Sequence, residues 1–165
     1  MVEEASIRRR SKVVIYLHFV WAVKQHVDNI PPELERPVHR IISSEVEHLK
    51  GKVVAIGGMS DHIHLLVQMP GSTNPSLLIK QVKGVTSAFI NDNRREFTEH
   101  FRWQDGYGCF SIGTDEESLT RVTSYIHHQK EHHTNNTLIS QWEQTGEEIE
   151  ISSSLRPEDA RPKAI

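Results

Sequence analysis

The chain has 165 residues, which is long enough for one domain with a buried core. Its one cysteine, Cys109, excludes an internal disulfide and a cysteine-rich zinc site. No apolar run is long enough to cross a bilayer, and residues 1–12 lack the apolar core of a signal peptide. We therefore expect a protein of the reducing cytoplasm, without a membrane partner.

The formal net charge is −3, and acidic residues are concentrated near the two ends of the chain. Residues 5–143 carry a net charge of +1 together with all 11 histidines. Nucleic-acid-binding proteins usually display a strongly basic surface. The composition therefore permits a nucleic-acid partner without predicting one.

The first part of the chain predicts three strands and a helix. A continuous β-branched and aromatic run over 12–24 predicts a central strand that is buried on both faces. Apolar residues at helical spacing predict a helix that begins near 32–37 and ends before Gly51. The runs 52–59 and 60–69 predict two neighbouring antiparallel strands, with a glycine pair where the chain bends.

The second part predicts helices around one further strand. An apolar stripe predicts a helix over 75–91, and the aromatic, glycine-rich segment 101–112 predicts a short strand. Thr114, with Glu117 three residues later, has the pattern of a capping box and predicts a helix that ends near 133–136. A short helix over 138–142 is also expected.

This order of elements predicts an α+β fold. We expect a ferredoxin-like antiparallel sheet with two helices on one face, plus an appended C-terminal helix that bears a tyrosine. The predicted domain spans 12–143, with a flexible N-terminus over 1–11. The polar composition of 144–165 predicts a disordered tail.

The strand over 60–69 carries the first candidate site. Its period of two places His62, His64 and Gln68 on one face, with the apolar residues that alternate with them on the other. Two imidazoles on a rigid strand can share a metal ion if a third ligand is available. On spacing alone, such a pair is more often structural.

Tyr125 and Gln129 are candidates for the other half of this site. They are four residues apart in the predicted third helix and border its apolar stripe, so both can face a cleft against the sheet. Two imidazoles and an amide oxygen leave coordination positions open for phosphodiester oxygens. The hydroxyl of Tyr125 can then attack phosphorus without a nucleotide cofactor.

The motif Asp61-His62-Ile63-His64-Leu65-Leu66 resembles the His-hydrophobic-His motif of the HUH endonucleases. The segment 125–133, Tyr-Ile-His-His-Gln-Lys-Glu-His-His, is similar to the tyrosine helix of the single-tyrosine transposases of the insertion sequence 200/605 family. The resemblance covers about 13–133 and includes the Trp-Gln-Asp-Gly-Tyr-Gly segment at 103–108.

The resemblance implies that His62, His64 and Gln129 bind Mg²⁺ or Mn²⁺ and that Tyr125 is the nucleophile. It further implies cleavage and rejoining of single-stranded DNA at hairpin-bearing transposon ends, through a 5′-phosphotyrosine intermediate. Members of this family are homodimers in which the tyrosine helix can complete the active site of the partner. The near-neutral body and the acidic tail of this chain depart from what is expected of a DNA-binding protein.

Other residues offer alternative interpretations. Tyr16 and Tyr107 are rival nucleophiles, although one lies in the predicted central strand and the other between two glycines. Histidines 127, 128, 132 and 133 form a cluster that can hold Zn²⁺ or Ni²⁺, contact phosphates or be solvated. We interpret His18, in the central strand, as a core residue.

Further residues are candidates for supporting roles. Asp61 can orient a ligand histidine or simply form a turn. The basic side chains that can contact DNA phosphates are Lys80, Lys83, Arg94, Arg95 and Arg102.

Two other functions compete with that of a transposase. A ferredoxin-like domain can bind nucleic acid on its sheet without catalysis. A small regulator that binds metal but no DNA is the third hypothesis.

Overall fold

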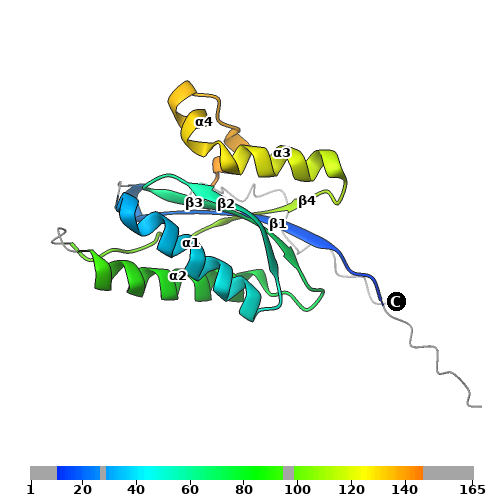
Figure 1. Ribbon diagram of the computed structural model, residues 1–165, viewed down its shortest axis with the longest axis horizontal. Coiled ribbons are helices and arrows are strands. Elements are labelled where there is room, and N and C mark those ends of the chain that lie inside the picture. Colours follow the sequence, from blue (N-terminus) through cyan, green and yellow to red (C-terminus); the bar gives the residue numbers. More distant parts are fainter. Residues whose placement is uncertain (1–10, 27–28, 95–98, 147–165) are drawn as a thin grey trace, which may run out of the picture.

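The computed structural model describes residues 11–26, 29–94 and 99–146 (Figure 1). The strands are β1 (Ile15–Ala22), β2 (Lys52–Gly58), β3 (His62–Met69) and β4 (Gly108–Ile112). The α-helices are α1 (Pro32–His48), α2 (Pro75–Asn93), α3 (Glu116–His127) and α4 (Gln129–Asn135). Two short 3₁₀ helices, η1 (Lys24–His26) and η2 (Ser140–Glu143), complete the described elements.

The four strands form one antiparallel sheet in the order β2-β3-β1-β4. The β-branched run predicted to be central indeed becomes β1, which pairs with both β3 and β4. Helices α1 and α2 cover one face of the sheet, and α3 lies across the other (Figure 1). This arrangement confirms the predicted α+β class, with two helices on one face and an appended helix that carries Tyr125.

The alternation of side chains along β3 separates two apolar clusters. Ile63, Leu65, Val67 and Met69 belong to the larger cluster, which includes the buried residues of α1 and α2. Leu66 belongs to the smaller cluster beneath α3. His62 and His64 have the same parity as Leu66, so they lie on the face that α3 covers.

The predicted third helix is interrupted. α3 ends at His127, and α4 begins at Gln129 after His128 adopts φ −104° and ψ 23°. The helix also begins one residue later than expected, because Asp115 and not Thr114 is its N-cap. The carboxylate of Asp115 accepts a hydrogen bond from the Ser118 backbone N–H at 2.8 Å.

The segment before β4 is mostly irregular. Only Gly108–Ile112 is a regular strand, and Trp103 joins the sheet through a single bridge to Val23. The short helix expected over 138–142 is the 3₁₀ helix η2, and its Trp142 is buried beneath α3.

Residues 1–10 of the predicted flexible N-terminus (1–11) and residues 147–165 of the predicted tail (144–165) lie outside the described residues. Residues 144–146 are described, and the Gln104 side chain donates a hydrogen bond to the Thr145 carbonyl at 2.6 Å. Within the described segments, no helix is both long and apolar enough to span a membrane.

Candidate metal centre and nucleophile

His62 and His64 lie on β3, an inner strand that β1 and β2 flank on its two sides. Both histidines are buried, with exposed fractions of 4% and 0%, and their ring centroids are 5.1 Å apart. Because ladder hydrogen bonds hold β3 on both edges, the two imidazoles project from a rigid base.

A hydrogen bond on Nδ1 orients each imidazole. His62 Nδ1 lies 2.6 Å from Asp61 Oδ1, and His64 Nδ1 lies 3.0 Å from Nε2 of His18 on β1. Burial opposes protonation of His62, but the hydrogen bond to Asp61 and nearby carboxylates outweigh it and raise its pKa. Burial lowers the pKa of His18 to about 3, so this completely buried imidazole is neutral. Both ligand candidates therefore have Nε2 available on the α3 side.

Tyr125 lies above these histidines on α3. Its ring centroid is 5.9 Å from that of His64, and only 3% of the residue is exposed. Its hydroxyl donates a short hydrogen bond to Oε1 of Glu143 and accepts one from the Ile139 N–H at 3.1 Å. Burial and the hydrogen bond to Glu143 raise its pKa to about 12, so the resting phenol is protonated.

Gln129 is the first residue of α4 and is 1% exposed. Its Oε1 lies 3.2 Å from His62 Nε2. The sequence predicts that Tyr125 and Gln129 share one face of a continuous helix. The break at His128 instead places Gln129 in a new helix, α4, and Gln129 reaches the site from there. The structure nevertheless brings together all four residues of the predicted site.

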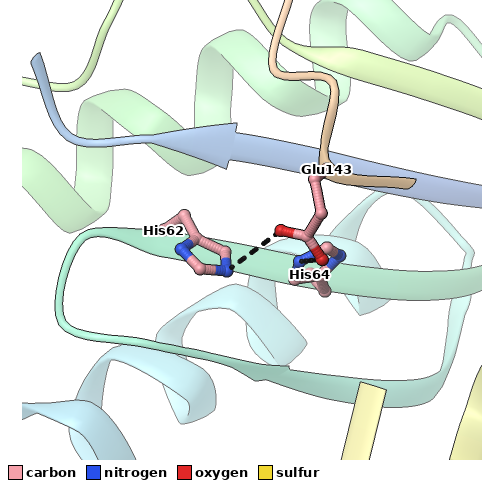
Figure 2. A group of neighbouring side chains, drawn as sticks. All are labelled: His62, His64 and Glu143. Atoms are coloured by element: carbon pink, nitrogen blue, oxygen red, sulfur yellow. Dashed lines mark ion pairs between the residues drawn. The ribbon is translucent and has the colours of Figure 1, made fainter. Parts of the chain in front are cut away.

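Glu143 is a member of the site that the sequence reasoning missed. It ends η2, and its carboxylate reaches between the two histidines of β3 (Figure 2). Oε2 lies 3.6 Å from His62 Nε2, and Oε1 lies 3.5 Å from His64 Nε2. Burial would raise the pKa of this carboxyl, but its interactions with His64 and Tyr125 lower it to about 2. The one available signal was its position directly after Trp142, an aromatic side chain able to anchor the segment.

Two histidines of the predicted cluster also lie here. His133 Nε2 is 3.3 Å from His62 Nε2, and the His132 ring stacks on Tyr125 with centroids 4.7 Å apart. His127 and His128 are exposed, so the cluster is divided between the site and the surface.

The rival tyrosines are placed elsewhere. The Tyr107 hydroxyl is 3.0 Å from Ser76 Oγ on α2, across the sheet from the two histidines. Tyr16 packs on the margin of the smaller apolar cluster, near the opposite end of β1 from the residues that pair with His62 and His64.

The candidate phosphate-binding side chains do not gather at this centre. Lys80, Lys83 and Arg102 line a groove beside α2. The Lys83 ammonium donates to the carbonyls of Gln104 at 2.8 Å and Gly106 at 2.7 Å. Arg94 donates to Asn29 Oδ1 at 2.7 Å and to the Glu99 carbonyl. Arg95 lies outside the described residues.

The donor set suits a divalent cation. Ligand atoms of His62, His64 and Glu143 lie within 4.8 Å of one another, and Gln129 adds an amide oxygen. Apart from the 3.5 Å contact with the Glu143 carboxylate, Nε2 of the fully buried His64 has no hydrogen-bond partner among the described residues. A metal ion would give this nitrogen a partner and would compensate the carboxylate of Glu143.

The fold and this site define a class of DNA-processing proteins. The family model described as "Transposase IS200 like" matches residues 11–129. The chain belongs to this family of IS200-like transposases.

Two curated relatives carry related names. A protein of Haemophilus influenzae described as a REP-associated tyrosine transposase is 26% identical over 121 residues, which are 68% of each chain. The transposase for insertion sequence element IS200 of Salmonella typhimurium is 25% identical over 118 residues, covering 69% of this chain and 76% of its own.

Two solved structures share the fold. One, described as a transposase from Deinococcus radiodurans R1, has a TM-score of 0.57 at 18% identity and covers 76% of this chain and 98% of its own. The other is a REP-associated tyrosine transposase bound to a REP hairpin. Its TM-score is 0.59 at 14% identity, with 78% and 74% of the two chains covered.

Proposed function

We propose that this transposase is a metal-dependent enzyme of the cytoplasm that cuts and rejoins single-stranded DNA through Tyr125. The observation that carries the proposal is the position of the Tyr125 hydroxyl. It is hydrogen-bonded to Glu143, whose carboxylate also lies within 3.6 Å of His62 Nε2 and His64 Nε2. A nucleophile and a candidate cation site thus share one carboxylate.

The reaction that fits this arrangement is a transesterification. The Tyr125 oxygen forms a bond to the scissile phosphorus, and the bond between phosphorus and the 3′ oxygen breaks. The product is a 5′-phosphotyrosine, and the departing 3′ oxygen takes a proton to become a 3′-OH. The proton that Tyr125 loses balances the proton that the 3′ oxygen gains, and Glu143, which accepts the phenolic hydrogen bond, orients the attacking oxygen.

His62, His64, Gln129 and Glu143 are the residues that would hold the metal, and Asp61 and His18 orient the two imidazoles. A bound Mg²⁺ or Mn²⁺ would supply positive charge to stabilise the phosphate as it is attacked. The Ile139 N–H donates to the Tyr125 oxygen, so it can stabilise negative charge when that oxygen leaves in the rejoining step.

For the substrate we propose single-stranded DNA that contains a hairpin at the ends of a mobile element. The relatives named as insertion-sequence and REP-associated transposases, and the structure bound to a REP hairpin, support this choice. Lys80 and Arg102, beside α2, remain candidates for phosphate contacts. The internal hydrogen bonds of Lys83 and Arg94 make them weaker candidates.

We also propose a homodimer, on the resemblance to dimeric single-tyrosine transposases. In the structure, Tyr125 and both histidines of one chain already lie together, which corresponds to an active site in cis. Exchange of the tyrosine helix between two copies would give the same set of residues in trans.

The test of the nucleophile is covalent capture. Incubation with Mn²⁺ and a labelled hairpin oligonucleotide derived from an element end should give a protein–DNA adduct that survives denaturing electrophoresis. Tyr125→Phe should abolish the adduct, because it removes the attacking oxygen and leaves the ring in place. Tyr107→Phe is the matched control, since its hydroxyl lies across the sheet. Undiminished adduct with Tyr125→Phe would disprove the assignment.

A further inference from the structure

Three atoms with lone pairs surround Nε2 of His62, and a single proton on Nε2 cannot hydrogen-bond well to all of them. Oε1 of Gln129 is 3.2 Å away, Nε2 of His133 is 3.3 Å away and Oε2 of Glu143 is 3.6 Å away. His133 Nε2 and Glu143 Oε2 are themselves 3.9 Å apart. The Gln129 carbonyl oxygen and the Glu143 carboxylate can only accept hydrogen bonds. Any N–H that donates a hydrogen bond within this group of atoms must therefore belong to His62 or His133.

These separations match those between ligands of a shared ion. With metal–ligand bonds of about 2.1 Å, neighbouring ligand atoms lie roughly 3.0–3.5 Å apart. The distances from His62 Nε2 to Gln129 and His133 fall in this range, and the distance to Glu143 is close to it, whereas the 3.9 Å between His133 and Glu143 is longer. A cation among these atoms would satisfy all four lone pairs.

We infer that His133 is a direct metal ligand, which makes this a three-imidazole site. The inference rests on the proposed function, since it concerns the ion expected at His62 and His64. His133 belongs to α4 and carries an imidazole to the same ion from outside the sheet. With 27% of its side chain exposed, it lies at the solvent edge of the site.

Three imidazoles determine which class of ion the site prefers. Mg²⁺ favours oxygen ligands and keeps several waters, whereas nitrogen ligands favour first-row transition metals. His62, His64 and His133 together with Glu143 therefore select Mn²⁺ or a later transition-metal ion over Mg²⁺. This set of ligands favours a transition metal, with His133 as an imidazole ligand from outside the His-hydrophobic-His strand.

The competing explanation is a simple hydrogen bond between two neutral imidazoles. His62 Nε2 would then donate to His133, or His133 to His62, with no ion between them. Under that explanation, loss of the His133 side chain can weaken metal binding through His62, but it removes no nitrogen from the ion itself.

Calorimetric titration of the full chain with Mn²⁺ and with Mg²⁺, without DNA, measures whether the His133 side chain contributes to metal affinity. Even an outer hydrogen-bond partner of a ligand typically contributes 10–100-fold to metal affinity, and a direct ligand should contribute at least as much, so His133→Ala should weaken Mn²⁺ binding by at least about tenfold. The affinity for Mg²⁺ should change less. His127→Ala removes an exposed histidine of α3 and is the matched control.

Pulsed EPR of bound Mn²⁺ separates the two explanations, because His133→Ala should lose one coordinated nitrogen only if His133 is a ligand. Weaker binding with an unchanged number of coordinated nitrogens would overturn the inference. Circular dichroism checks that each variant is folded. If His133→Ala and His127→Ala both bind Mn²⁺ like the unmodified chain, His133 is not a ligand, although the proposed function survives. If Mg²⁺ binds as tightly as Mn²⁺, the selectivity is wrong. If neither ion binds the unmodified chain, the metal-dependent function fails as well.

Discussion

At the scale of single residues, the two histidines of β3 have different hydrogen-bond partners on Nδ1. Asp61 is a carboxylate and raises the basicity of His62, whereas His18 is neutral and hydrogen-bonds His64 in a completely buried position. Nδ1 of His18 has no hydrogen-bond partner among the described residues. Protonation of His18 would place an uncompensated charge in the core, which is why its pKa is low.

This burial makes stability depend on pH. The pKa of His18 is about 3 in the folded chain and 6.5 in the reference state, so the unfolded chain binds more protons between these values. The contribution of neutral His18 to the free energy of unfolding is complete above pH 6.5 and is lost as the pH falls toward 3. Between pH 7.5 and 5.5 we expect a loss of about 1 kcal/mol from this group.

Urea denaturation at the two pH values measures that loss. His18→Gln should reduce the difference in unfolding free energy between pH 7.5 and 5.5, because glutamine does not titrate. His127→Gln, which replaces an exposed histidine, should leave the difference as it is. An equal pH dependence in the unmodified chain and in His18→Gln would contradict the assignment.

At the scale of elements, the position of α3 depends on a glycine of β2. A Cβ at Gly57 would lie 2.3 Å from the backbone oxygen of Ile126, so only glycine permits this approach of helix and strand. Ile126 directly follows Tyr125, and the contact therefore sets the height of the nucleophile above the sheet.

Gly57→Ala should push α3 away from β2. Overpacking of this kind costs about 1–3 kcal/mol, and we expect both a lower melting temperature and slower adduct formation. Gly84→Ala is the matched control, since a Cβ there meets nothing within 4 Å. In the interior of α2 that change should stabilise the chain by about 0.5–1 kcal/mol. If Gly57→Ala has the stability and the rate of the unmodified chain, the contact does not position Tyr125.

At the scale of the whole molecule, the candidate site joins parts that are distant in sequence. His62 and His64 come from β3, Gln129 and His133 from α4, and Glu143 from η2. An ion held by all three elements would bind only the folded chain with high affinity. Metal binding should therefore raise global stability.

The melting temperature measures this coupling. At a free Mn²⁺ concentration of 100 times the dissociation constant, the stabilisation should be about 2.7 kcal/mol, which corresponds to several degrees in a chain of this size. Chelation should reverse the shift, and His62→Ala should not show it. A melting temperature that Mn²⁺ leaves unchanged in the unmodified chain would argue against a site shared by these elements.

Local patterns were sufficient to predict much of this protein. The strand segments, the two faces of β3 and the main helices follow from periodicity, because each depends on neighbours a few residues apart. The family was recognisable from the residues around His62 and Tyr125, and the match over 11–129 confirms it. The catalytic and metal-binding roles of these residues remain predictions.

Only the tertiary structure decided what surrounds those residues. Glu143 and His133 reach the site because the chain breaks at His128 and η2 returns beneath α3, where Trp142 is buried. Likewise, the sequence could not show that internal carbonyls hold the Lys83 ammonium. These features depend on long-range packing, which no local period encodes, whereas the faces of β3 were already determined by the alternation of its residues.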